Sequence, residues 1–174
     1  MMAEQRATDP QPAVRRPQLP HRWRRRLARL PIGLYRVGLG YLFGKRLPLL
    51  HHIGRASGLD QRVVLEVVSH DPEQSSWTIA SGFGTGSAWY QNLRKTPKTM
   101  VQVGNRLHAL TAHFLTEAEG GEAMARYAPL HSRAARRLCA FIGFDVDGSV
   151  ESYRRAGHHI PFVCLDAASD RPLP

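Results

Sequence analysis

The sequence predicts a mainly β domain with inserted helices, closed into a small barrel rather than a parallel βαβ sheet. About six short strand-like runs follow one another from Leu47 to Leu165, and helical segments lie between some of them. Several runs are almost continuously apolar, which is typical of strands that are covered on both faces. A barrel interior on one side and covering helices on the other would provide that burial.

The strands are predicted from β-branched runs that end at turn residues. Asp71-Pro72 marks one turn, and Gly104-Asn105 is a strong signal for a two-residue hairpin. We expect strands at 47–53, 62–69, 77–81, 99–103, 106–115 and 160–165.

The helices are predicted from capping residues and prolines. Ser87 is expected to cap a short helix, AWYQNLRK, which Pro97 ends. The segment 116–119, Thr-Glu-Ala-Glu, matches a capping box and opens a helical stretch to about residue 142, which Pro129 is expected to divide. A further short helix is expected around 151–155.

The positive charge belongs to the N-terminal segment rather than to the barrel. Of the net charge of +10, residues 1–46 carry all but about one unit. The expected organisation is a tail at 1–20, a basic amphipathic helix at 21–46, the barrel at 47–168 and a tail at 169–174. The apolar run at 30–44 is too short and too interrupted to span a bilayer, and no signal-peptidase site follows it.

Two interpretations of the basic helix stay open. It packs on its own domain, or it lies on an anionic membrane surface. The expected localisation is accordingly cytoplasmic, or peripheral on the inner face of the cell membrane. A nucleic-acid partner is not expected, because no base-reading module accompanies the arginines.

Metal and hydrolase chemistry are poorly supported. His51-His52 and His158-His159 are adjacent pairs on expected strands, so the two members of each pair point to opposite faces and cannot clasp one metal ion. The sequence contains no G-x-S-x-G motif. Cys139 and Cys164 are expected to be free thiols.

Residues 54–58, GRASG, contain the parts of an anion-binding loop. The glycines let backbone N–H groups converge, Arg55 supplies a positive fork, and Ser57 adds a hydroxyl donor. Arg62 could extend this loop from the next strand. An ordinary hairpin turn that contains an arginine is the alternative.

A second candidate is the segment from Ala80 to Asn92. Small residues at Ala80 and Ser81 would let a flat ring approach the backbone, and Trp89 and Asn92 would form a wall beside it. The alternative is that Trp89 and Leu93 are simply the buried face of a helix.

The order of these motifs resembles the deazaflavin (F420)-dependent nitroreductase and quinone reductase family. GRASG, VLEVV, IASGFG, SAWYQNL and VQVG follow one another as in that family, and the resemblance extends to the late IPFV strand. It implies a split β-barrel of the FMN-binding, flavin-reductase type that binds coenzyme F420, a deazaflavin with an acidic tail. It also implies hydride transfer to a quinone, a nitroaromatic compound or a similar small electrophile, and a homodimer is plausible.

The resemblance assigns site residues one by one. Arg55 and Ser57 would hold the phosphate or acidic tail, the backbone of Ala80 and Ser81 would lie against the ring, and Trp89 and Asn92 would complete the pocket. The full set of expected coenzyme contacts is Arg55, Ser57, Gly58, Gln61, Arg62, Ala80, Ser81, Trp89 and Asn92.

The chain departs from the family at three loop positions. Ala56 stands where the family has Lys or Arg, and Asp60 and Gln61 stand where it has Pro and Arg. A protein of the same fold that uses FMN, or that binds a ligand without catalysis and docks on a membrane through its basic segment, is therefore the alternative. Ser81, Tyr90 and Tyr153 are candidate proton donors by residue type only.

Overall fold

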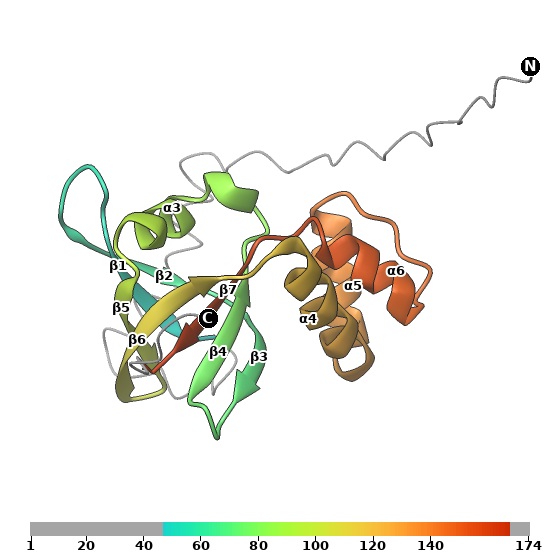
Figure 1. The fold of residues 1–174 in the computed structure, drawn as a ribbon, viewed down its shortest axis with the longest axis horizontal. Helices are drawn as coiled ribbons and strands as arrows, with labels where there is room; N and C mark the ends of the chain where they lie inside the picture. Colours follow the sequence, from blue (N-terminus) through green and yellow to red (C-terminus); the bar gives the residue numbers. More distant parts are fainter. Residues whose placement is uncertain (1–46, 168–174) are drawn as a thin grey trace, which may run out of the picture.

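A single antiparallel sheet of seven strands forms the centre of the described part of the chain, residues 47–167 of the computed structural model (Figure 1). One short helix, α3, lies over an end of the sheet, and α4, α5 and α6 form a group at the side of the sheet. The elements are β1 (Leu49–Ile53), β2 (Asp60–Val64), β3 (Val67–Asp71), β4 (Ser76–Ala80), the 3-10 turn η2 (Gly84–Gly86), α3 (Ala88–Lys95), β5 (Lys98–Val103), β6 (Arg106–Phe114), α4 (Glu117–Leu130), α5 (Ser132–Phe141), α6 (Val150–Gly157) and β7 (Phe162–Asp166).

The strand order forces this sheet to curl into a barrel. The order is β2-β1-β5-β6-β7-β4-β3, so β2 and β3 are the two outer edges. These edges are consecutive in the chain, and only Leu65 and Glu66 join them. A link of that length spans at most about 11 Å, which brings the edges together at one end. No pairing joins β2 to β3 in residues 47–167, so the barrel is split along this seam.

The link between β2 and β3 corrects one prediction and confirms another. The run 62–69 was predicted to be one strand, but the chain crosses the seam at Leu65 and Glu66 and divides it in two. An uninterrupted apolar pattern carries no signal for this break, because both halves are strands. The mainly β fold and the split barrel are confirmed, with seven strands instead of about six.

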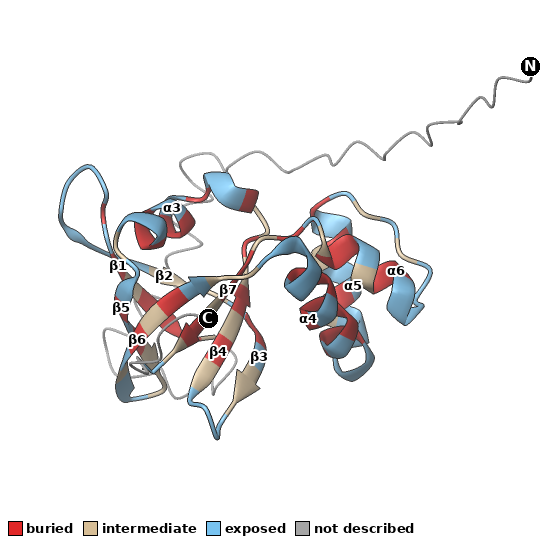
Figure 2. Ribbon diagram, in the orientation of Figure 1, coloured by how far each residue is buried: buried red, intermediate tan, exposed pale blue. Residues whose placement is uncertain are grey.

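The interior of the barrel is filled by side chains that face one another across the strands. Leu50 pairs with Val101, and Ile79 pairs with Val163, all at most 1% exposed. Leu93 of α3 is fully buried in the same cluster, so α3 closes one end of the barrel. Figure 2 shows buried segments along the strands of the sheet and on α3.

A second apolar cluster lies among α4, α5 and α6. Glycines allow α4 and α6 to touch, because a Cβ on Gly157 would lie 2.6 Å from the carbonyl oxygen of Gly120 and 2.7 Å from the Cβ of Met124. The predicted capping box is confirmed: the Thr116 hydroxyl accepts from the Glu119 amide, and the Glu119 carboxylate accepts from the Thr116 amide. The predicted division of this stretch is also confirmed, since α4 ends directly after Pro129, at Leu130.

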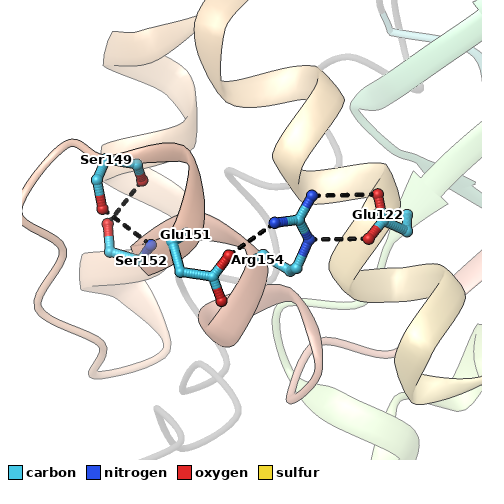
Figure 3. Close-up of polar contacts among 5 residues, drawn as sticks. All are labelled: Glu122, Ser149, Glu151, Ser152 and Arg154. Carbon is cyan, nitrogen blue, oxygen red and sulfur yellow. Dashed lines mark hydrogen bonds and ion pairs between the residues drawn. The ribbon is translucent and has the colours of Figure 1, made fainter.

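An exposed ion-pair group joins α6 to α4 (Figure 3). The Arg154 guanidinium donates to both carboxylate oxygens of Glu122, at 2.8 and 3.4 Å, and to Glu151 at 2.7 Å. Arg154 lowers the pKa of Glu122 through this hydrogen bond. The Ser149 hydroxyl, also drawn in Figure 3, accepts from the Ser152 amide and caps α6.

Two further predictions can be compared with the structure. His158 and His159 do not lie on a strand but in the turn after α6. The histidine pair was misassigned because the strand that follows begins only at Phe162. The tails at 1–20 and 169–174 and the basic helix at 21–46 lie outside the described residues. Within residues 47–167, no helix is both long and apolar enough to cross a membrane.

Candidate functional site

The loop between β1 and β2 is a tight turn closed by its glycines. The Gly58 amide donates to the Gly54 carbonyl at 2.7 Å, and the Gly54 amide donates to the Leu59 carbonyl at 2.8 Å. Gly58 has φ +68°, a region that favours glycine. A Cβ on Gly54 would lie 2.5 Å from the Ser57 hydroxyl oxygen and 2.9 Å from the Gln61 Nε2, so a larger residue here would displace these two side chains. The loop therefore presents Arg55 and Ser57 in a fixed backbone frame.

Helix α3 holds this loop through Asn92. The Asn92 side-chain oxygen accepts from the Arg55 backbone amide at 3.1 Å and from the Arg55 Nη1 at 3.2 Å. Asn92 is 2% exposed, so these bonds are largely shielded from water. One turn later on the same helix, Lys95 Nζ donates to the Arg55 carbonyl at 2.8 Å. Two side chains of α3 thus position one arginine, and Figure 1 shows the helix beside the β1–β2 loop.

The other end of the Asn92 amide contacts a buried histidine. Asn92 Nδ2 lies 2.9 Å from His52 Nδ1 and 3.5 Å from the Gln61 side-chain oxygen. Because the Asn92 oxygen faces Arg55, its NH₂ group donates, and His52 Nδ1 must be the acceptor of a neutral ring. Burial lowers the pKa of His52, while Asp60 raises it and His51 lowers it further. The neutral form that the geometry requires is thus also the form that burial favours.

Arg62 belongs to the opposite face of the hairpin. Its Nε donates to Asp60 at 3.1 Å, and His51 Nδ1 lies 3.5 Å from the same carboxylate oxygen. Gln61, between them in the chain, points instead to Asn92. Alternation along β2 explains this separation, so the structure brings Gln61 to Asn92 but does not bring Arg62 there.

The Ser81 hydroxyl lies inside the loop that follows β4. Ser81 is 2% exposed, and its oxygen lies 2.7 Å from the Gly84 carbonyl and 2.6 Å from the Ser87 hydroxyl. Ser87 occupies the expected cap position of α3, but its hydroxyl donates to Gly84 instead of capping the helix. The Ser81 amide donates to the Pro161 carbonyl. A flat group could therefore stack on this segment, but it would not gain a hydrogen bond from the Ser81 amide.

The aromatic residues of α3 face the barrel interior. Trp89 and Tyr90 are 7% and 5% exposed, and both belong to the same apolar cluster as Leu93. The packing interpretation of Trp89 therefore describes its main contacts, and its place beside a coenzyme stays a prediction. Tyr153 is buried in the separate cluster of α4, α5 and α6. The proposed proton-donor roles of Ser81, Tyr90 and Tyr153 remain predictions as well.

Sequence reasoning missed His52 and Lys95. Lys95 follows Asn92 by three positions on a helix, a spacing that places both on one face and could have identified it. His52 stands in an adjacent histidine pair, a pattern that argues against a metal site but carries no signal for a hydrogen bond to a distant helix. Its role depends on the register of the hairpin, in which His52 pairs with Gln61.

The comparisons with known proteins identify the family. The family model described as F420H(2)-dependent quinone reductase matches residues 32–136, and the chain belongs to this family. It is therefore an F420-dependent oxidoreductase, and its coenzyme is F420. The description names quinone reduction, whereas the nitroreductase activity of the sequence-based prediction receives no support from it.

The structural comparisons give more distant likenesses. One is to a structure described as F420-H2 Dependent Reductase (FDR-A), with 17% identity, 71% of this chain and 96% of that chain covered, and a TM-score of 0.49. Another is to a pyridoxamine 5'-phosphate oxidase-related, FMN-binding protein from Nostoc punctiforme, with 13% identity, 84% and 81% covered, and a TM-score of 0.47. Both scores are below 0.5, so the fold described above depends on the chain's own strand order. No curated protein matches the chain.

The β1–β2 loop fits the acidic tail of this coenzyme. Asn92 accepts only one of the five guanidinium N–H groups of Arg55 in the described contacts, which leaves donors for an anion. Lys95 adds a second positive charge at the same loop. Asp60, the acidic residue of the hairpin, is paired with Arg62 on the other face. Lys95 thus places a positive charge at a loop in which Ala56 and Gln61 stand where the family pattern has basic residues.

Proposed function

We propose that this protein binds reduced F420 at the β1–β2 loop and α3 and uses it to reduce a quinone. The observation that carries the proposal is the Asn92 contact, which fixes both the backbone and the guanidinium of Arg55. An arginine held in advance loses less conformational entropy when it binds an anion. The family match supports the choice of coenzyme and of a quinone as the acceptor.

The residues of the chain bind and orient, because the hydride chemistry belongs to the coenzyme. When bound, reduced F420 supplies a hydride and a proton, which together convert a quinone to its hydroquinone and leave the oxidised coenzyme. Arg55, Ser57 and Lys95 would hold the phosphate or the carboxylates of the tail. Asn92 keeps Arg55 in place, and neutral His52 keeps the Asn92 amide in the orientation that Arg55 needs.

The loop after β4 would border the ring. Its hydroxyl groups, from Ser81 and Ser87, are satisfied within the loop, so they stiffen it. A stiff, small-residue segment suits a flat ring that must stay in one place for hydride transfer. The expected homodimer and the membrane contact of residues 21–46 remain separate predictions.

Replacing Arg55 by glutamine tests the proposal. We expect the KM for reduced F420, followed with a saturating quinone, to rise at least about tenfold, since charge-assisted hydrogen bonds contribute on the order of 1.5–3 kcal/mol. We expect kcat to change much less, because Arg55 acts on the tail and not at the ring.

Arg106→Gln is the matched control. Arg106 is the first residue of β6, and in the chain the six residues of β5 lie between α3 and this position. Its replacement removes the same charge as Arg55→Gln. This variant is expected to retain its KM within about twofold. Equal effects of the two substitutions, or a normal KM in Arg55→Gln with unchanged thermal stability, would contradict the proposed binding site.

A further inference from the structure

A groove runs along helix α5, outside the loop that contains Arg55. Its volume is about 690 Å³. It is lined by the junction of α4 and α5, by α5 itself and by one residue of the link between β2 and β3. The lining residues are Leu130, His131, Ser132, Arg133, Ala134, Arg137, Leu138 and Phe141, together with Glu66 of the link.

Part of this groove is an exposed apolar surface. Leu130, at the end of α4, is 78% exposed and Phe141 of α5 is 45% exposed, and the half-buried Leu138 lines the same groove. Large apolar side chains that remain open to water next to a groove are typical of a ligand-binding surface. The size of the groove suits a small ring compound.

The groove also has a positive rim. Arg133 and Arg137 are one helical turn apart, and no ion pair or hydrogen bond to their side chains occurs within residues 47–167. Among the described lining residues, Glu66 carries a negative charge and Arg133 and Arg137 carry positive charges, so the net charge of the lining is positive. Apolar surface beside guanidinium groups that have no acidic partner among residues 47–167 is complementary to a molecule that has an apolar body and an acidic group.

Phe141 connects this groove to the loop that would border the ring of the coenzyme. Its ring contacts Phe83 edge to face, with centroids 5.2 Å apart. It also covers Gly82, where an added Cβ would lie 3.0 Å from the Phe141 ring. Both residues belong to the segment directly after Ser81. A molecule in the groove would therefore lie next to this loop, on the side of α5.

We propose that the groove binds the electron acceptor and that the preferred acceptor is an amphipathic acid, an apolar ring body with one sulfonate or carboxylate. This inference rests on the proposed function and extends it by naming the chemical class of acceptor. Arg133 and Arg137 bind the acidic group, and Leu130, Leu138 and Phe141 contact the ring body. The redox step is the one given above: a quinone gains the hydride and the proton and becomes the hydroquinone.

Two quinones that differ in charge test this specificity. The probes are 1,4-naphthoquinone-2-sulfonate, which is anionic, and 2-methyl-1,4-naphthoquinone, which is neutral. Their intrinsic reactivities differ, so the quantity to compare is the ratio of their kcat/KM values in each variant. In the double variant Arg133→Gln, Arg137→Gln we expect this ratio to fall about tenfold, with the neutral quinone little affected.

Arg136→Gln is the control on the same helix. Arg136 does not line the groove, and its guanidinium lies toward Gly148. Its substitution should leave the ratio unchanged within about twofold. An equal loss for both quinones in the double variant would overturn the proposal, since it would indicate a structural effect. A weakened affinity for F420 with an unchanged ratio would also overturn it, because the arginines would then hold the coenzyme tail.

Direct binding separates this inference from the proposed function. Isothermal titration of the full-length protein with the naphthoquinone sulfonate, without coenzyme, should show saturable binding that the double variant loses. If the protein shows no F420-dependent turnover but this binding persists, the groove assignment survives and the proposed function fails. If the sulfonate does not bind to wild-type protein or binds equally to the double variant, the groove assignment fails by itself.

Discussion

Replacing Asn92 by alanine tests the contact by which α3 holds the Arg55 loop. The substitution removes one oxygen that accepts from Arg55 at 3.1 and 3.2 Å and one NH₂ group that lies 2.9 Å from His52 Nδ1. It leaves the partly buried backbone amide of Arg55 and a buried ring nitrogen of His52 without these partners. The effect is therefore expected on folding stability and on coenzyme binding together.

The magnitude follows from the number of bonds. A typical hydrogen bond contributes about 1 kcal/mol net, so three of them correspond to about 3 kcal/mol of unfolding free energy. For a domain of this size, such a loss lowers Tm by roughly 10 °C. Arg55 also becomes free to rotate, and its ordering on binding should cost about tenfold in affinity for F420.

Thermal unfolding and a binding titration of the same preparations provide the assay. Gln91→Ala is the control, because the neighbouring Gln91 is exposed and its side chain makes one hydrogen bond within residues 47–167, to the Thr85 carbonyl. This control should shift Tm by no more than about 2 °C. If Asn92→Ala behaves like Gln91→Ala in both measurements, Asn92 neither supports the fold nor positions Arg55, and the reasoning is refuted.

Two further predictions concern pH and helix packing. Because burial lowers the pKa of His52 below its usual 6.5, the unfolded chain takes up a proton that the folded chain resists. The unfolding free energy should consequently fall as the pH drops below about 6.5. His52→Gln should reduce the pH dependence of the unfolding free energy, measured by denaturant titrations between pH 5 and 7. An unchanged pH dependence would show that His52 does not titrate as argued. Gly157→Ala should lower the unfolding free energy by about 1–3 kcal/mol, because its Cβ would overlap α4, whereas Gly86→Ala, which has open space, should be nearly neutral. Similar unfolding midpoints for these two variants would contradict the close packing of α4 and α6.

The elements that could be predicted from the sequence are those fixed by local chemistry. The Gly104-Asn105 hairpin, the Thr116 capping box and the helix after Ser87 depend on residues within a few positions of one another. The break at Leu65 and Glu66 could not be predicted, because it is set by the path of the chain between two sheet edges. Local propensity favours strand on both sides of that break.

The candidate site was predictable in part for the same reason. The glycines and Arg55 form a local motif, and the opposite orientation of Arg62 that the structure shows follows from strand alternation. The roles of His52 and Asn92 require the hairpin and α3 to meet, 40 positions apart in the chain. The groove along α5 requires the helix to face the seam of the barrel, which no local pattern indicates.

The most direct test of the central claim is an equilibrium titration of the full-length protein with F420, run beside FMN under the same conditions. The structure and the family match predict saturable binding of F420 at micromolar concentrations or below, on the order of 8 kcal/mol of binding free energy, and much weaker binding of FMN. Tight binding of FMN without binding of F420 would keep the fold and overturn the coenzyme. Absence of binding for both would show that the Arg55 loop, with Ala56 and Gln61, does not hold the tail of a deazaflavin.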